Sequence, residues 1–490
     1  MYSDRWHVAR VFLPGGPLRP PSSPFHRDHR LGIPVPGRPH PPRRATRIVE
    51  QMDAPPPARL RNQRLPLALV TIAVVGMVAT VGGGIRIENP ATIADRGRLA
   101  VVDARGSLST VDARGESVQD LAVPGVAFQF PAWSPDGARI AAVGTGQDGS
   151  GVYVFDADAP GTDPALLYES RDRPPFYLSW SPDGARVSFL TTESAGIALR
   201  VAPVDAAAEA EVVREGEPFY WDWVAPDRLL LHVGSGRGSF VGEVGLDGST
   251  RETGVIESGL FRAPAVSAGA EYRAWVGPAA GAEQAVVVES RDGSGRHVVP
   301  VHGNVAFGFD STATALAFIS AQDATAAPTL LPLGPLQVVA ADSGEVRILR
   351  DGPVLGFFWS PDGATIAALS LPDPATPDVE DAVALAVVDA ALAAPPAVLA
   401  PGVRLHLAFI DAATGEIRSE RHVRVTDTFV FQVLPYFDQY ALSHRVWAAD
   451  GSAIALPLAS RDDGDQLAIL SVDGSDPILV DSAVMGFWSP

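Results

Sequence analysis

The 490-residue sequence contains no cysteine, no lysine and only three asparagines. Without cysteine it can form no disulfide, thiolate metal site or cysteine nucleophile, and it lacks the lipidated cysteine of a bacterial lipoprotein. This absence assigns no cellular compartment, because a large domain can be stable without disulfides. All 38 basic residues are arginines, which the codon bias of a GC-rich genome explains better than a functional demand does.

Charge is distributed unevenly along the chain. The formal net charge is −19, but the first 64 residues hold twelve arginines against four acidic residues. The rest of the chain therefore carries about −27. This acidity argues against a nucleic-acid partner, since binding to a phosphate backbone needs clustered cations.

The N-terminal residues 1–64 are rich in proline and arginine, as at 39–44 and 55–57. Such a composition buries too little apolar surface to fold. We therefore expect a disordered tail on the cytoplasmic side of a membrane. Met52 is an alternative start, which would leave only a short basic lead before the next segment.

Residues 65–85 form an uncharged, mostly aliphatic run. Twenty-one residues at helical rise span about 30 Å, the thickness of a bilayer core. Arginines at 59, 61 and 64 precede the run, so the positive-inside rule places the N-terminus in the cytoplasm and the bulk of the chain outside. We expect a single-pass transmembrane signal anchor here, followed by a linker at 86–94. A cleaved signal peptide and a buried core helix are the alternatives.

A short unit recurs in the rest of the chain. Residues 133–141 read Trp-Ser-Pro-Asp-Gly-Ala-Arg-Ile-Ala, and close copies begin at Trp180 and Trp359. Pro-Asp-Gly supplies a fixed φ, a side-chain acceptor and a residue tolerant of positive φ, in the order that a tight turn needs. The flanking runs are rich in aromatic and branched residues, as strands are. Degenerate copies begin at Trp223, Val266, Phe309 and Trp447.

A second hairpin follows each first one, so every 40–50 residues supply four antiparallel strands. This unit resembles the repeat of the TolB-like and WD40-like (PD40 repeat) β-propeller family, and the resemblance covers residues 95–490. It implies an all-β fold, a closed β-propeller of four-stranded antiparallel blades. The motif is specific for this architecture and unspecific for function.

The two ends of the domain carry complementary parts of the repeat. Residues 485–490 end on Trp-Ser-Pro, and 95–102 align with 136–143, the part of the unit that should follow. We expect one composite blade, with its inner strand from the C-terminus and three strands from the start of the domain. Such pairing hides strand edges that invite aggregation. With seven further starts the count is eight blades, and seven or six is the alternative if a degenerate copy is misread.

One interval is longer than the others. The step from Trp359 to Trp447 is 88 residues, where about 45 are expected. The excess is rich in proline, alanine and acidic residues, and it contains no second Trp-turn unit. We predict an insertion between strands at about 370–402, rather than a ninth blade. Insertions of this kind often carry binding.

Catalytic motifs are scarce. The chain has no Gly-x-Ser-x-Gly, and the glycine-rich 234–238 lacks the Lys-Ser/Thr end of a phosphate loop, so a hairpin turn is favoured. His406 and His422 are placed to face each other on paired strands, but two histidines without a suitable carboxylate do not predict a metal site. Ca²⁺ binding by residues 462–465 or by the acidic insertion is an alternative to ordinary solvated turns.

The stretch 429–445 departs most from the repeat. It combines aromatic residues with Gln, Asp, His and Arg just before an inner strand, and in a propeller it would lead into the central channel. Packing between blades is the plainer explanation. The candidate ligand-binding residues are Gln432, Tyr436, Phe437, Asp438, Gln439, Tyr440, His444 and Arg445.

These observations favour a binding or scaffolding protein over an enzyme. We expect a membrane-anchored, extracytoplasmic propeller that binds or scaffolds a protein, peptide or glycan, with no catalytic residues and no required cofactor. The alternative is a propeller hydrolase or lyase with a cation site in the channel. A signalling sensor is a third possibility, although the tail contains no recognisable output domain. Fold analogy alone does not supply the ligand.

Overall fold

The computed structural model describes residues 96–194, 196–205, 209–234, 239–252, 263–279, 281–322, 331–372, 404–460 and 464–490. These residues belong to one compact unit, Ile85–Pro490. The expected tail, membrane anchor and linker lie outside the described ranges, as does nearly all of the predicted insertion. No helix within these ranges is both long and apolar enough to cross a membrane.

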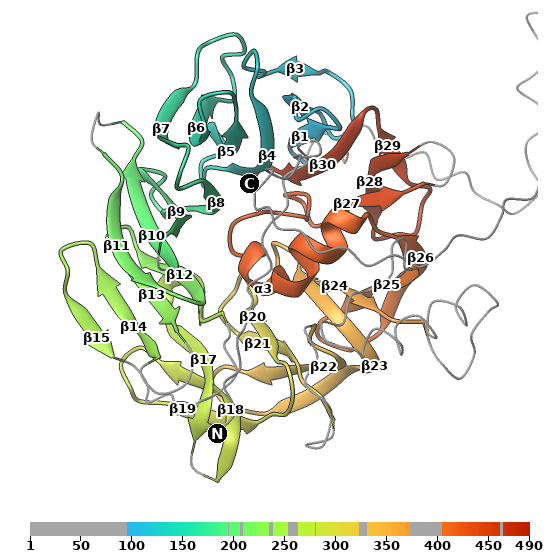
Figure 1. Ribbon diagram of the computed structural model, residues 1–490. Helices are drawn as coiled ribbons and strands as arrows, with labels where there is room; N and C mark the ends of the chain where they lie inside the picture. The colour runs from blue at the N-terminus through green and yellow to red at the C-terminus, as the bar shows by residue number, and fades with distance from the viewer. Residues whose placement is uncertain are drawn as a thin grey trace, which may run out of the picture. The chain divides into compact units, whose positions relative to one another are not determined.

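The described residues form an all-β structure of short antiparallel strands (Figure 1). The strands are β1 (Leu99–Asp103), β2 (Leu108–Val111), β3 (Gln119–Asp120), β4 (Ala127–Trp133), β5 (Arg139–Thr145), β6 (Ser150–Asp156), β7 (Ala165–Ser170), β8 (Pro175–Trp180), β9 (Arg186–Glu193), β10 (Gly196–Pro203), β11 (Glu211–Gly216), β12 (Phe219–Ala225), β13 (Arg228–Val233), β14 (Phe240–Gly245), β15 (Thr250–Glu252), β16 (Ala265–Val266), β17 (Tyr272–Ala279), β18 (Ala282–Ser290), β19 (Arg296–Pro300), β20 (Ala306–Phe309), β21 (Ala315–Ile319), β22 (Gly334–Ala340), β23 (Val346–Trp359), β24 (Thr365–Ser370), β25 (Arg404–Asp411), β26 (Ile417–Arg424), β27 (Ala453–Ala459), β28 (Asp465–Ser471), β29 (Ile478–Val480) and β30 (Ala483–Trp488).

Five of the sheets have four strands each, and four of these five run in chain order: β4–β7, β8–β11, β12–β15 and β16–β19. A seven-stranded sheet, β20–β26, divides at β23, whose first part pairs with β22 and whose last part, from Val354 to Trp359, pairs with β24. The three-stranded sheet β27–β29 gains a fourth member through the bridge between Trp447 and Ile454. Counted in this way, and with the composite sheet included, the described residues form eight four-stranded units, consistent with the eight expected blades.

The composite sheet has the predicted construction. Its order is β3–β2–β1–β30, so the last strand of the chain completes a sheet begun by the first three. In the register of β1 and β30, Leu99 lies opposite Trp488 and Val102 lies opposite Met485. This confirms that the repeat continues across the two ends of the domain.

The Ser-Pro-Asp-Gly turns share one hydrogen-bond pattern. In the first, the Ser134 hydroxyl donates to Asp136 at 2.6 Å and accepts from the Arg139 amide at 2.9 Å. Gly137 takes a φ of 71°, which a side chain disfavours. The pKa of Asp136 lies below its usual value because the carboxylate accepts from Ser134 and from the backbone of Ala138. The motif is therefore a turn-forming unit.

The hydrophobic core lies between adjacent sheets. One cluster joins Ala132 and Val152 of the β4–β7 sheet to Trp180 and Phe189 of the β8–β11 sheet, and others join later pairs in the same way. The composite sheet contacts β4 on one side and β27 and β28 on the other, so the series closes on itself. Figure 1 shows the sheets following one another around a short helical segment. This is the architecture of a β-propeller.

Candidate functional site

Residues 429–444 form a helical segment among the inner strands, which we call the central segment. It consists of a π-helical turn (Phe429–Val433), a 3-10 turn (Leu434–Tyr436), the short helix α3 (Phe437–Tyr440) and the turns up to His444. Figure 1 labels α3 in the middle of the sheets, and α3 contacts both β20 and β23. The stretch predicted to lead into the channel therefore occupies its centre.

Aromatic contacts hold the central segment against several inner strands. Phe437 packs edge-on against Phe357, with ring centroids 5.2 Å apart. Tyr440 contacts Phe130 at 5.3 Å and Tyr177 at 5.1 Å, on two further sheets. His444 lies 4.8 Å from the ring of Phe487 in β30. The segment is thus packed against strands from four different sheets.

Two inner strands carry equivalent bulges that face this segment. Phe130 in β4 has a φ of 50° and Tyr177 in β8 has a φ of 44°, both in the left-handed region. The strand registers shift at both places, and each residue lies three positions before the tryptophan of its repeat. Bulges of this type redirect side chains, and backbone strain of this kind is tolerated where surrounding contacts fix it.

Gln439 makes the most extensive polar contacts of the central segment. Its side chain is 4% exposed, accepts from the Trp221 amide at 3.1 Å and donates to the Trp221 carbonyl at 2.8 Å. It also donates to the Tyr177 hydroxyl, which in turn donates to the Gln439 carbonyl at 2.6 Å. The amide therefore pairs with the edge of β12 much as another strand would.

His444 is buried and both of its ring nitrogens are engaged. Nε2 donates to the Phe130 carbonyl at 3.1 Å, so in the neutral ring Nδ1 accepts from the Ser443 hydroxyl at 2.6 Å. Burial lowers the pKa of His444 to about 4. The histidine is therefore neutral near pH 7 and acts here as a hydrogen-bonding bridge to β4.

Two carboxylates lie near the centre. Asp438 is buried and accepts from the Gln439 amide at 3.0 Å. Asp222 in β12 is half-buried and accepts from the Val266 amide of the neighbouring sheet at 2.9 Å. Burial raises the pKa of Asp222 to about 7. The Asp222 carboxylate thus links β12 to β16, a role that its sequence position did not suggest.

The outer side of the central segment exposes aromatic rings. Tyr436 is 43% exposed and Phe431 is 40% exposed. The Tyr436 ring lies 6.3 Å from that of Tyr220 in β12, and we call these two residues the tyrosine pair. Gln432 is half-buried and Arg445 is exposed.

The structure thus separates the eight candidate residues into two groups. Phe437, Asp438, Gln439 and His444 are buried, and Tyr440 is half-buried among aromatic rings. Gln432, Tyr436 and Arg445 keep exposed surface. Their role in ligand binding stays a prediction. The sequence interpretation missed the inner-strand partners of the segment, which are Phe130, Tyr177, Tyr220 and Trp221.

His406 and His422 face each other, as their spacing suggested. They lie opposite in the register of β25 and β26, with ring centroids 5.1 Å apart. His406 also contacts Arg350 at 2.8 Å and Glu420 at 3.3 Å. Over the ranges that the structure describes, no group of three or more His, Asp or Glu residues is placed to hold a metal ion. Of residues 462–465, considered for Ca²⁺, Asp462 and Asp463 lie outside those ranges, as does nearly all of the acidic insertion.

The structure contains a cavity of about 340 Å³ away from the central segment. Strands β10 and β11 and the turn after β14 form its walls. A much smaller cavity, about 20 Å³, lies beside Phe429 and Val433 of the central segment.

No protein-family model matches the chain, and no curated protein matches it in sequence. Solved structures that it resembles are TolB-like and other propeller proteins. TolB from Acinetobacter baumannii is 17% identical, with a TM-score of 0.34, over 52% of this chain and 66% of that one. An oligogalacturonate lyase in complex with manganese is 12% identical, with a TM-score of 0.39, over 78% and 84% of the two chains.

A prolyl endopeptidase is 11% identical, with a TM-score of 0.49, over 74% of this chain and 50% of that one. For the TolB structure described above, the matched region covers just under two thirds of the length of that chain. Two of these proteins are enzymes, a lyase and an endopeptidase, and such low identities transfer no activity to this chain. The fold and the contacts of the central segment define the class of this protein: a β-propeller whose centre is occupied by its own helical segment.

Proposed function

We propose that the chain is a closed, eight-bladed, membrane-anchored propeller that lies outside the cytoplasm and binds a protein, peptide or glycan. The observation that carries the binding role is the exposed ring of Tyr436 on the otherwise internally bonded central segment, which lies beside the half-buried Tyr220 of β12. The side chains of Gln439 and His444 form hydrogen bonds with inner strands, whereas Tyr436 has 43% of its surface exposed. Exposed tyrosines combine apolar area with a polar tip and are enriched at binding surfaces.

The proposed location rests on the apolar run at 65–85 and the arginines before it. The run matches the bilayer core in length, and its flanking charges favour an N-terminus inside the cytoplasm. The test is a full-length chain with alkaline phosphatase fused after Pro490, expressed in a bacterium. We expect a membrane-bound fusion with high phosphatase activity, which requires an extracytoplasmic location. An inactive fusion, or one released into the soluble fraction, would contradict the anchor.

The binding role is tested by placing a photo-crosslinking phenylalanine analogue at position 436 of the full-length chain in its native membrane. Leu479, which is 52% exposed on β29, provides the control position. We expect a discrete adduct from position 436 that is absent from position 479 and weakened by Tyr220→Ala. Equal adducts from both positions would contradict a site at the tyrosine pair.

The alternative, a cation-dependent hydrolase or lyase, differs in a measurable way. It requires turnover of a polysaccharide or ester that stops when a chelator removes the cation and resumes when the cation returns. Binding without turnover, unaffected by the chelator, supports the proposed role. Chelator-sensitive turnover would replace it.

A further inference from the structure

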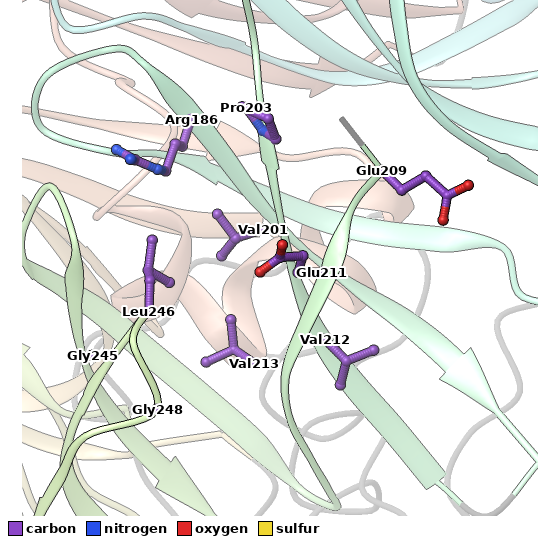
Figure 2. Close-up of a pocket in the computed structure, with 10 residues that line it drawn as sticks. All are labelled: Arg186, Val201, Pro203, Glu209, Glu211, Val212, Val213, Gly245, Leu246 and Gly248. Carbon is purple, nitrogen blue, oxygen red and sulfur yellow. The ribbon is translucent and has the colours of Figure 1, made fainter. Parts of the chain in front are cut away.

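The cavity of about 340 Å³ lies between two neighbouring sheets, away from the tyrosine pair. We call it the interblade groove. Val201, Val213 and Leu246 give it apolar walls, and its size falls in the range of ligand sites. Figure 2 shows the ten lining residues, which are Arg186, Val201, Pro203, Glu209, Glu211, Val212, Val213, Gly245, Leu246 and Gly248.

The charged groups of the groove are predominantly acidic. Glu209 and Glu211 are both exposed, and neither forms a salt bridge with another residue of the described ranges. Arg186 is the positive group in the lining. Its guanidinium already donates to the Pro226 carbonyl at 3.3 Å and lies 3.7 Å from Asp183. The groove therefore presents unpaired negative charge beside an apolar floor.

One wall of the groove is an edge strand. In its sheet β11 is outermost, and it pairs only with β10 among the described strands. Val212 of this strand is 44% exposed. An edge strand offers unpaired backbone groups to which an extended peptide can add. The same strand carries Glu211, so backbone pairing and charge recognition coincide in one place.

From this combination we propose that the interblade groove binds an extended peptide segment that carries lysine or arginine. The aliphatic stem of the basic side chain packs on Val201 and Val213, as such stems do on apolar surfaces. Its charged end meets Glu209 and Glu211, while the peptide backbone pairs along β11. Neither the tyrosine pair nor the membrane anchor takes part in this site. The proposal therefore goes beyond the proposed function, and its tests are independent of that function.

The first test compares peptides on the full-length chain in detergent micelles. The probe is a fluorescein-labelled octapeptide of alternating valine and lysine, and its fluorescence anisotropy reports binding. Matched peptides replace lysine by glutamate or carry N-methyl groups on alternate backbone nitrogens. We expect binding of the lysine peptide at least about tenfold tighter than that of either matched peptide. Equal binding of the lysine and glutamate peptides would overturn the proposal.

Unlabelled spermidine tests whether a peptide is needed. A site that recognises only positive charge is emptied by this polyamine as readily as by the unlabelled lysine peptide. We expect the lysine peptide to compete at concentrations about tenfold lower. Equal competition, or an N-methylated peptide that binds as tightly as the unmodified one, would exclude pairing along β11.

The second test uses variants of the groove. The double variant Glu209→Gln/Glu211→Gln removes the two charges and preserves side-chain size, so we expect the lysine peptide to bind about tenfold more weakly. Glu215→Gln provides the control, since Glu215 is exposed on the same strand but does not line the groove. An unchanged affinity in the double variant, or an equal loss in the control, would refute the site. The peptide comparison remains decisive if the double variant fails to fold.

Discussion

The indole N–H of Trp133 donates to the carbonyl oxygen of Phe487 at 3.0 Å, across a sequence separation of 354 residues. This bond joins the composite sheet to the β4–β7 sheet. Three further indole N–H groups make the same kind of hydrogen bond. Each donates to the carbonyl of the residue just before the equivalent position in the preceding sheet: Trp180 to Ala132, Trp359 to Gly308 and Trp447 to Phe358. The repeated tryptophan therefore links neighbouring blades as well as filling the space between them.

Two tryptophans depart from this pattern. Trp223 donates to the hydroxyl of Ser188, which itself donates to the Ser179 carbonyl, so a side chain is interposed in the same link. The indole nitrogen of Trp488 is buried and has no hydrogen-bond partner among the residues that the structure describes. The carbonyl of Val446, which the pattern would offer to Trp488, accepts from the Ala455 amide.

This difference predicts unequal effects of the same substitution. Trp447→Phe removes an indole that bonds at 3.0 Å and leaves the Phe358 carbonyl without that donor, whereas Trp488→Phe removes a donor that has no partner in the described part of the chain. We expect Trp447→Phe to cost about 1–2 kcal/mol more of the free energy of unfolding than Trp488→Phe. Urea unfolding of the full chain in micelles, followed by tryptophan fluorescence, measures the difference. Equal losses would mean that the indole bond adds nothing to the packing.

A disulfide can test the composite sheet, since the natural chain contains no cysteine. Val102 and Met485 lie opposite each other on β1 and β30. We expect Val102→Cys/Met485→Cys to form an intramolecular disulfide on mild oxidation. Because the bond closes a very long loop, it should raise the stability by about 2–4 kcal/mol.

The same double variant in its reduced form is the matched control for that measurement. Thermal unfolding of the oxidised and reduced forms gives the shift in Tm, and mass spectrometry counts the free thiols. Free thiols after oxidation, or a disulfide that joins two chains, would show that the two ends do not pair within one molecule.

The repeat and the ring closure were accessible from the sequence because their causes are local. Ser134, Asp136 and Gly137 form a turn through contacts within a few residues, and the same letters recur wherever the turn does. The alignment of residues 95–102 with 136–143 then predicted the pairing of β1 with β30. This part of the fold could be predicted because the same local turn interactions recur along the chain.

The contacts between the central segment and the inner strands could not be predicted from the sequence in the same way. The left-handed backbone at Phe130 and Tyr177 is held by contacts with residues more than 250 positions away. One signal was nevertheless present. Phe130, Tyr177 and Tyr220 each lie three residues before the tryptophan of their repeat, and His444 lies three before Trp447. Phe130 and Tyr177 both contact His444, and Tyr220 contacts Tyr436 of the central segment.

Gln439 should contribute strongly to stability. Its amide satisfies both the N–H and the carbonyl of Trp221, and it donates to Tyr177. Gln439→Ala removes the partner of the buried Trp221 N–H and carbonyl, whereas Tyr177 keeps its bond to the backbone carbonyl of residue 439, and we expect a loss of about 2–4 kcal/mol in the free energy of unfolding. Gln432→Ala, on the half-buried side of the same segment, should change it by less than about 1 kcal/mol. Urea unfolding of both variants gives the comparison, and equal losses would count against the role assigned to Gln439.

The pH dependence of stability should carry a contribution from His444. Its folded pKa of about 4 lies below the ordinary value of 6.5, so the unfolded chain binds the proton more readily between these values. The stability due to neutral His444 is therefore fully present above about pH 6.5. It is lost as the pH falls toward 4, by about 3 kcal/mol in total. Asp222, with a folded pKa of about 7 against the ordinary value of 3.8, acts with the opposite sign, because the folded chain keeps this proton more readily, so its contribution to stability falls as the pH rises from about 4 to 7 and is constant above that.

The variant His444→Gln separates the two effects, because glutamine can still donate to the Phe130 carbonyl and accept from Ser443 but does not titrate. Urea unfolding of both proteins at several pH values from 4 to 8 gives their stability difference at each pH. We expect the natural chain to lose stability relative to the variant as the pH falls from 6.5 to 4, while the Asp222 contribution cancels in the difference. A stability difference that stays constant over this range would show that His444 titrates with an ordinary pKa, and hence that its site is hydrated rather than buried.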